Sequence, residues 1–236
     1  MSAPLAIAVL GARGKMGRFA ADAIEEADGF RVAARLGSED ALEQAAALGA
    51  TIGLDLTRAG LGFEHGERLL QAGLRIVIGT SGVDQEQTAE LDRLARGLGL
   101  GGVVVPNFSI GAWLQQRLAC DAARYLGSVS IVETHHPSKR DAPSGTARQT
   151  AEGLARALGV PVDQVPIQSS RVEGVHAEQR VLLGARAELL TIQHQVQGRE
   201  AYRAGLLSSL RFAASTDGVA RGLDAVLAAE GGRKAN

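Results

Sequence analysis

The first half of the chain alternates between short apolar segments and amphipathic ones. Apolar runs or alternations typical of buried strands occur at 5–10, 30–36, 51–56, 75–78 and 103–105. Between them, apolar residues recur at helical spacing over 15–27, 39–48, 64–72 and 84–96. Because strands that alternate with helices pair in parallel, this pattern predicts an α/β fold with a Rossmann-like, doubly wound parallel sheet.

The pattern changes after residue 106. A helix and a strand are predicted, then a helix and two strands, and finally two helices, at 109–126, 129–134, 144–158, 179–183, 188–194, 201–214 and 222–229. We therefore expect a second, α+β domain over 107–199. The first, dinucleotide-binding domain would consist of 1–106 together with about 200–236.

The composition is that of an ordinary soluble globular protein. The 236 residues are 45% hydrophobic and 22% charged, and the net charge of -1 gives no support to binding of nucleic acid or of an anionic membrane. The single cysteine, Cys120, excludes an internal disulfide and a cysteine-based zinc cluster. No apolar run reaches the ~20 residues of a membrane helix, and the first run lacks the basic start of a signal peptide. We expect a cytoplasmic protein.

A glycine-rich turn lies between the first predicted strand and the first predicted helix. The turn has the spacing G-x-x-G-x-x-G and consists of Gly11, Ala12, Arg13, Gly14, Lys15, Met16 and Gly17. Glycines permit a tight turn and close approach of the backbone, and the helix N-terminus offers free N–H groups to a pyrophosphate. The turn predicts a dinucleotide site, although many parallel-sheet proteins turn this way without one.

The end of the second predicted strand bears on the choice of cofactor. Where a ribose-binding carboxylate is expected, the chain has Gly37 and Ser38, while Glu39 and Asp40 look like the first turn of the next helix. Three residues could bind a 2′-phosphate instead, namely Arg13, Lys15 and Ser38. This favours NADPH over NADH, unless the two basic residues are simply solvated loop charges.

Two later loops follow predicted strands, at the edge where open α/β sheets bind ligands. Their residues are Gly79, Thr80 and Ser81, and then Val105, Pro106, Asn107 and Phe108. We expect both loops to continue the cofactor site, although either would pass for an ordinary turn by itself.

The segment 133–147 reads ETHHPSKRDAPSGTA and concentrates groups that hold and protonate a small anion. His135 and His136 are adjacent, and Lys139 follows on a predicted loop. Because successive strand residues point to opposite faces, one histidine could protonate a ligand while the other binds its carboxylate. A metal site is the competing interpretation, but a well-spaced third ligand is missing and Lys139 would repel a cation.

The same segment ends at the start of a predicted helix. Pro143 sets a helical φ, and Gly145 lets a ligand approach the backbone. The backbone N–H groups of Gly145 and Thr146, with the Thr146 hydroxyl, would clamp a carboxylate. Ser144 could bind substrate as well, or serve as an ordinary N-cap.

This segment resembles the pattern E-x-H-H-x-x-K-x-D-A-P-S-G-T-A of the dihydrodipicolinate reductases, which it meets in full. Further segments are similar to the family's cofactor turn, its I-D-F-T strand end, its G-T-T loop and its N-F-S segment, at 11–17, 55–57, 79–81 and 106–109. The resemblance covers nearly the whole chain.

The resemblance implies a reductase of the diaminopimelate route to lysine. It would reduce hydroxy-tetrahydrodipicolinate, a small dicarboxylate, to tetrahydrodipicolinate with NADPH or NADH. It implies His135 as proton donor or acceptor and Lys139 as proton donor or charge stabiliser, with His136, Gly145 and Thr146 on the substrate carboxylate. It also implies a homotetramer built by the sheet of the second domain, and hinge closure that brings cofactor to substrate.

Two departures from the family pattern stand out. The usual G-D-I-V-G-E-H stretch is barely recognisable at 173–179, which bears on the loop before the late strands and on tetramer contacts. Arg199 follows Gly198 where the family has Ser-Arg.

Two other functions are weighed against the reductase. A related imine dehydrogenase would need different residues between His135 and Thr146, and a nicotinamide-sensing regulator would be expected to lose His135 or Lys139.

Overall fold

The computed structural model describes residues 3–234, which divide into two compact units. Unit 1 holds the described residues up to Phe108 and those from Tyr202 onward, and unit 2 holds Ser109–Ala201. The expected boundaries lay at residue 106 and near residue 199. Each unit has its own sheet and its own apolar core.

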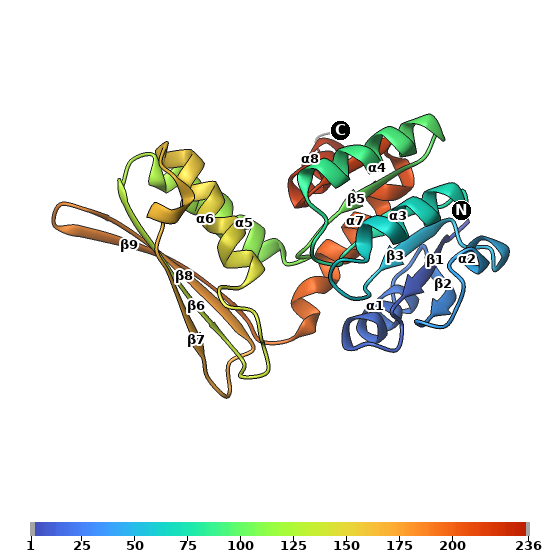
Figure 1. Ribbon diagram of the computed structural model, residues 1–236, viewed down its shortest axis with the longest axis horizontal. Helices are drawn as coiled ribbons and strands as arrows, with labels where there is room; N and C mark the ends of the chain where they lie inside the picture. The colour runs from blue at the N-terminus through green and yellow to red at the C-terminus, as the bar shows by residue number, and fades with distance from the viewer. Residues whose placement is uncertain (1–2, 235–236) are drawn as a thin grey trace. The chain divides into compact units, whose positions relative to one another are not determined.

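Unit 1 contains a six-stranded sheet whose strands are all parallel (Figure 1). The strand order is β10-β5-β4-β3-β1-β2. Their bounds are β1 (Leu5–Leu10), β2 (Phe30–Leu36), β3 (Ile52–Asp55), β4 (Arg75–Ile78), β5 (Gly101–Val104) and β10 (Gly218–Arg221). The predicted Rossmann-like sheet is confirmed.

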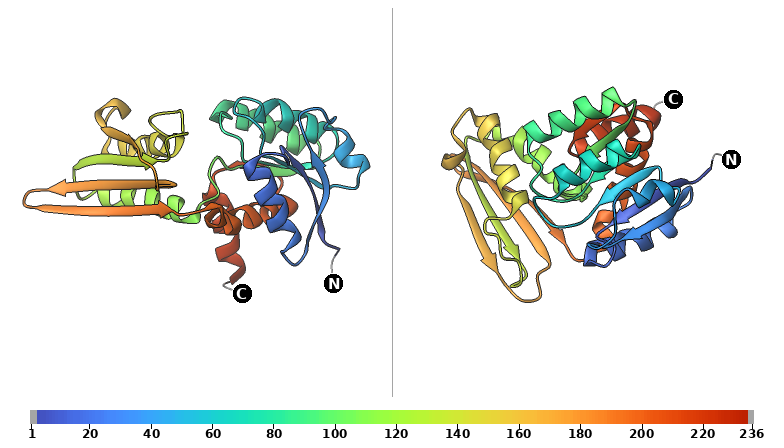
Figure 2. Two further views of the ribbon diagram at one scale, coloured as in Figure 1. Left: turned by 90° about the horizontal axis from the view of Figure 1, so that it is seen from below. Right: turned by 45° about the vertical axis from the view of Figure 1, so that its right-hand side comes forward.

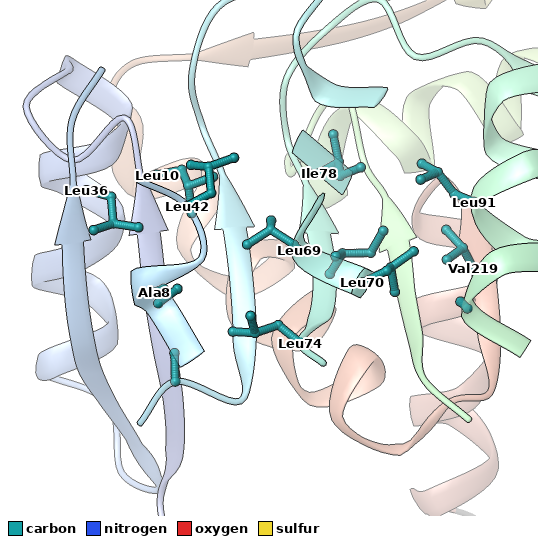
Figure 3. Packing of buried hydrophobic residues seen from close by; sticks show 14 of the residues in the cluster. Ala8, Leu10, Leu36, Leu42, Leu69, Leu70, Leu74, Ile78, Leu91 and Val219 are labelled. Carbon is teal, nitrogen blue, oxygen red and sulfur yellow. The ribbon is translucent and has the colours of Figure 1, made fainter. Parts of the chain in front are cut away.

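Helices cover both faces of this sheet, which is why its strands carry continuous apolar runs. One face bears α1 (Lys15–Glu25), α7 (Arg203–Ser215) and α8 (Leu223–Lys234), and the other α3 (Gly62–Gln71) and α4 (Gln85–Gly97) (Figure 2). The α3–α4 side of the core is one apolar cluster that includes Leu69, Leu70, Ile78 and Leu91 (Figure 3).

The chain reverses its direction of travel across the sheet at β1. The first connection leads from β1 to β2 on one side, and the next returns to β3 on the other side of β1. The carboxyl ends of β1 and β3 therefore flank a topological switch point, where doubly wound sheets bind their ligands.

Unit 2 contains a four-stranded mixed sheet in the order β7-β6-β8-β9, with β7 parallel to β6 and the other pairs antiparallel. Its strands are β6 (Ser128–His135), β7 (Ile167–Arg171), β8 (Ala177–Ala185) and β9 (Glu188–Val196). Helices α5 (Ile110–Ala123) and α6 (Gly145–Leu158) pack together on one face of the sheet (Figure 1). Short 3₁₀ turns lie at Val162–Gln164 and Arg199–Tyr202.

Three elements differ from the expectation. A helix was predicted over 39–48, but only α2 (Gln44–Ala47) forms, because residues 37–43 make a loop. Strand β7 was not predicted, since its sequence IQSSR is mostly polar and exposed. Strand β10 was not predicted either, because GVAR is four residues long and starts at a glycine with φ of +75°.

Within residues 3–234, no helix is both long and apolar enough to cross a membrane. The same residues include no group of three or more histidine, cysteine, aspartate or glutamate side chains arranged to hold a metal ion.

Candidate active site

The glycine turn lies at the switch point of unit 1, between β1 and α1. Gly11 has a φ of +74°, and a Cβ there would lie 2.7 Å from the Leu56 carbonyl oxygen, so the turn must pack closely on the end of β3. A Cβ on Gly17 would lie 2.1 Å from the Gly11 carbonyl oxygen. Gly14 caps α1 without a side-chain hydrogen bond, and the first turn has no acidic residue. The backbone N–H groups at this end of α1 thus suit a pyrophosphate.

Arg13 extends from this turn to the end of β2. Its Nε would lie 3.2 Å from a Cβ placed on Gly37, so its guanidinium lies over that glycine. Asp40 also reaches this point, and its Oδ2 accepts a hydrogen bond of 2.7 Å from the Gly37 N–H. The interpretation of Asp40 as a helical residue is therefore wrong. Lys15 and Ser38 are both exposed. Lys15 lies on the first turn of α1, and Ser38 lies in the loop after β2.

The two later loops meet the end of β3 at the same edge of the sheet. The Gly79 N–H donates to the Asp55 carbonyl oxygen at 2.9 Å, and a Cβ on Gly79 would touch both Leu56 and Phe108 within 2.7 Å. Val105 and Phe108 are buried, whereas Ser81 is exposed. The structure thus gathers the predicted cofactor segments around β3, and the close glycine packing fits a dinucleotide cradle.

In unit 2, Glu133 and His135 lie two residues apart on β6 and share its inner face. The Glu133 side chain is completely buried, and its Oε2 contacts His135 Nδ1. Burial alone would raise the pKa of Glu133, but hydrogen bonds from Ser169 and His135 hold that pKa below its usual value. Because a carboxylate only accepts, His135 Nδ1 carries the donated proton and Nε2 is left for a ligand.

Arg171 completes this cluster from the end of β7. Its Nη1 lies 3.2 and 3.3 Å from the two Glu133 carboxylate oxygens, and its Nε donates to the Lys139 carbonyl oxygen at 3.2 Å. Arg171 therefore both neutralises the buried carboxylate and holds the loop that carries Lys139.

The second ring proton of His135, which would make it an imidazolium, is loosely held. Burial lowers the pKa of His135 below the usual value for histidine, and the positive charges of Lys139 and Arg171 act in the same direction. Glu133 opposes them but does not outweigh them. At neutral pH His135 is thus mainly the neutral imidazole, whose Nε2 can exchange a proton with a bound molecule.

Lys139 and His136 follow on the loop after β6. Lys139 Nζ is paired with Asp141 at 2.8 and 3.0 Å, and its side chain is 24% exposed. His136 Nδ1 lies 2.7 Å from Ser138 Oγ, and its ring faces His176 at a centroid distance of 5.9 Å. Both can be reached by a ligand, although Lys139 would have to exchange its partner Asp141 for it.

The N-terminus of α6 is joined to the same cluster. Ser144 is the N-cap: its Oγ accepts from the Ala147 N–H at 3.1 Å, and its own N–H donates to Glu133 Oε1 at 3.3 Å. Its hydroxyl therefore works as a cap, as the alternative interpretation held. Gly145 is exposed and Thr146 partly exposed at the start of the helix, where the first backbone N–H groups have no partner within an α-helix.

A buried network of amide side chains holds this end of α6 in place. Gln115 Nε2 donates to the carbonyl oxygens of Gln179 and Ile192, at 2.7 and 2.8 Å. Gln179 Nε2 donates to Gln115 Oε1 and to Thr150 Oγ1, and Thr150 in turn donates to the Thr146 carbonyl oxygen at 2.9 Å. The first turn of α6 is thereby tied to α5, β8 and β9.

Sequence reasoning missed Glu133 and Arg171 as members of the site. Glu133 carried a signal, because it lies two residues before His135 on a predicted strand and thus on the same face. Arg171 carried none, because β7 was not predicted. His176 likewise became a neighbour of His136 only in the folded chain.

The parallel sheet with its glycine turn, together with the mixed-sheet unit that carries the histidine and lysine cluster, defines a class first, that of Rossmann-like oxidoreductases with a second unit. The chain belongs to the dihydrodipicolinate reductase family. The models for the N-terminus and the C-terminus of that family match residues 5–108 and 111–227. Membership makes the chain a reductase.

Individual relatives agree with this assignment. The 4-hydroxy-tetrahydrodipicolinate reductase of Streptomyces coelicolor is 38% identical, over 93% of this chain and 96% of its own. The enzyme of the same name from Legionella pneumophila strain Lens is 36% identical, over 94% and 98%. The dipicolinate-bound dihydrodipicolinate reductase from Paenisporosarcina sp. TG-14 superimposes with a TM-score of 0.80 at 30% identity, covering 93% and 98% of the two chains.

Proposed function

We propose that the chain reduces 4-hydroxy-tetrahydrodipicolinate to tetrahydrodipicolinate with a nicotinamide cofactor, as a step of the diaminopimelate route to lysine. The reaction adds a hydride and a proton to the substrate and releases water. A reduced nicotinamide supplies the hydride when it is bound by the glycine turn and the loops around β3. The observation that carries the proposal is the folded segment 133–147, whose histidine, lysine loop and helix N-terminus are joined through Glu133 and Arg171.

The proton chemistry falls to His135 and Lys139. Glu133 fixes the tautomer of His135, so that Nε2 faces the ligand and can accept or donate a proton. Lys139 can donate a proton to the reduced substrate or stabilise negative charge on it, once the substrate takes the place of Asp141. The charged lysine and the neutral histidine thus form a donor and acceptor pair on one loop.

The carboxylates of the substrate would be held by His136, Gly145 and Thr146. Two backbone N–H groups at the start of α6 suit one carboxylate, because the helix dipole favours negative charge there. The Thr146 hydroxyl and the ring of His136 add donors, and Ser144 shapes this end of the helix as its cap. The dipicolinate bound by the Paenisporosarcina enzyme is a dicarboxylate of this kind.

The function is tested by a coupled assay in which a synthase forms the substrate from pyruvate and aspartate semialdehyde. Loss of the absorbance of reduced nicotinamide, dependent on both precursors, is the expected result. A protein that binds the cofactor but oxidises none would instead support the regulator that senses nicotinamide.

NADPH is proposed as the preferred cofactor over NADH. The guanidinium of Arg13 over Gly37 supports this preference, because it lies where a 2′-phosphate would follow β2. Asp40 acts against it, although its carboxylate is occupied by the Gly37 N–H. Arg13→Ala should lower kcat/KM for NADPH more than tenfold and leave the value for NADH within about threefold. Equal losses with both cofactors would refute the role of Arg13.

A homotetramer in the cytoplasm remains a proposal that rests on the family resemblance. Helices α5 and α6 pack on one face of the unit 2 sheet, and side chains on β9 such as Leu189, which is 67% exposed, are available to a second copy. Sedimentation analysis of the purified chain would give its oligomeric state directly.

A further inference from the structure

The end of β3 is the point where the predicted cofactor segments of unit 1 meet. The Leu56 N–H donates to the Leu10 carbonyl oxygen at 3.1 Å, next to the glycine turn. The Asp55 carbonyl oxygen accepts from the Gly79 N–H at 2.9 Å and from Thr80 Oγ1 at 3.3 Å. A shift of this short segment would therefore disturb both the glycine turn and the loop after β4.

The Asp55 side chain fixes this segment from within. It is completely buried, and its Oδ1 accepts hydrogen bonds from the Thr57 N–H at 2.9 Å and from the Thr57 hydroxyl at 2.6 Å. This arrangement closes a tight turn directly after the strand, in which the carboxyl group takes the place of a backbone acceptor.

His65, in the first turn of α3, provides the remaining partner. Its Nδ1 lies 3.3 Å from Asp55 Oδ2 and 3.3 Å from Thr57 Oγ1, and its side chain is 13% exposed. Because the Thr57 hydroxyl donates its proton to Asp55, its oxygen can only accept from the ring. The network therefore assigns the proton to Nδ1, which is shared between the two acceptors.

We propose that Asp55, Thr57 and His65 are positioning residues that hold the β3–α3 loop in the shape that binds the cofactor. The inference rests on the proposed function, because it supposes a dinucleotide at the switch point. None of the three is proposed to touch the reacting atoms. Their effect is on cofactor affinity, through the backbone of Leu56 and Thr57, against which Gly11 packs, and through the Leu56 side chain, against which Gly79 packs.

The test compares two substitutions of His65. His65→Leu removes the donor but fills the space, whereas His65→Asn places an amide N–H close to the position of Nδ1. Thr57→Val is the independent variant, because valine keeps the shape and the backbone N–H but loses the hydroxyl. Glu64→Gln, an exposed change on the same helix, is the matched control.

Two measurements are made on each variant. Hydrogen exchange of the Thr57 amide in the cofactor-free protein reports on the turn itself, and titration of NADPH fluorescence gives the Kd. His65→Leu and Thr57→Val should each speed exchange and raise Kd about tenfold, which corresponds to about 1.4 kcal/mol. The kcat at saturating cofactor should stay within about twofold, and His65→Asn should recover most of the affinity.

The outcomes separate this inference from the proposed function. Unchanged Kd in His65→Leu and Thr57→Val, with normal binding by the unaltered chain, overturns the positioning role alone, even if exchange is faster. A loss of kcat without a change in Kd also overturns it. If the unaltered chain binds neither NADPH nor NADH, the proposed function fails and this inference fails with it. Should His65→Leu not fold, Thr57→Val decides.

Discussion

Replacing Glu133 by glutamine tests whether the buried carboxylate sets the protonation of His135. The glutamine side chain has the same shape but carries one NH₂ group in place of an acceptor oxygen. If the NH₂ group takes the place of Oε2, it faces the proton on His135 Nδ1, and if it takes the place of Oε1, it faces the Ser144 N–H. In either position it also faces Arg171 Nη1, which lies 3.2 and 3.3 Å from the two oxygens in the unaltered chain. Whichever way the amide turns, a donor meets a donor.

The size of the effect follows from these contacts. The amide drives His135 towards the tautomer with its proton on Nε2, which blocks proton acceptance from a ligand. In the Ser-His-Asp triad the corresponding change lowers kcat about 10⁴-fold. Here Lys139 is proposed as a second proton source, so we expect a fall in kcat of about 10²- to 10³-fold. Weakening the charged hydrogen bonds of Arg171 should also cost about 1.5–3 kcal/mol of folding stability.

The assay is the steady-state rate with saturating cofactor as a function of pH. Glu133 raises the pKa of His135, so its removal should move the His135 inflection to lower pH. The positive charge of Arg171 lowers the same pKa, so Arg171→Met, which removes the charge but keeps an unbranched apolar side chain, should move the inflection to higher pH. The Kd for NADPH should not change in either variant, because both residues lie in unit 2.

Two results would refute this reasoning. A kcat for Glu133→Gln within about threefold of the unaltered chain would show that the tautomer of His135 does not limit the reaction. Shifts of the inflection in the same direction for both variants would show that the charges of Glu133 and Arg171 do not act on His135 as described.

Three further predictions concern the loop, the carboxylate clamp and stability. Lys139→Ala should lower kcat about 100-fold or more, and near-normal turnover would remove Lys139 from proton transfer. His136→Ala should mainly raise the KM for the substrate, so a change confined to kcat would contradict its binding role. Burial lowers the pKa of His135, His176 and His194, so the stability they contribute is complete above their unfolded pKa of about 6.5 and is lost as pH falls through the folded values. Melting of the chain between about pH 7 and 5 should show falling Tm, and a flat Tm would contradict this.

The local sequence pattern was sufficient to predict an element where that element is apolar and regular. Strands β1, β3, β4 and β5 were predicted because helices bury them on both faces, which favours continuous apolar residues, and the edge strand β2 was predicted from its alternation. Strand β7 was not predicted because it lies at the edge of its sheet, where Gln168, Ser169 and Ser170 are exposed. Its pairing with β6 depends on contacts distant in sequence, which no local pattern records.

The same limit applies to the site. The histidines, the lysine and the helix start could be predicted as site residues because they lie within fifteen consecutive residues. Arg171 and the buried pair Gln115 and Gln179 come from other elements, and a glutamine in an amphipathic sequence reads as a solvent-facing residue. That Gln179 lies opposite Glu133 follows only from the register of β6 with β8.

Both units contain the same supersecondary arrangement beside their proposed ligand sites. The order β1–α1–β2 joins two parallel strands in unit 1, and β6–α6–β7 does so in unit 2, with a helix N-terminus following the first strand in each case. On the proposed function, common buffer anions such as sulfate and phosphate would therefore have two places at which to compete, one with the pyrophosphate and one with the substrate carboxylate. Apparent affinities for both ligands should then weaken in phosphate buffer, and the choice of buffer becomes a variable of every titration of this chain.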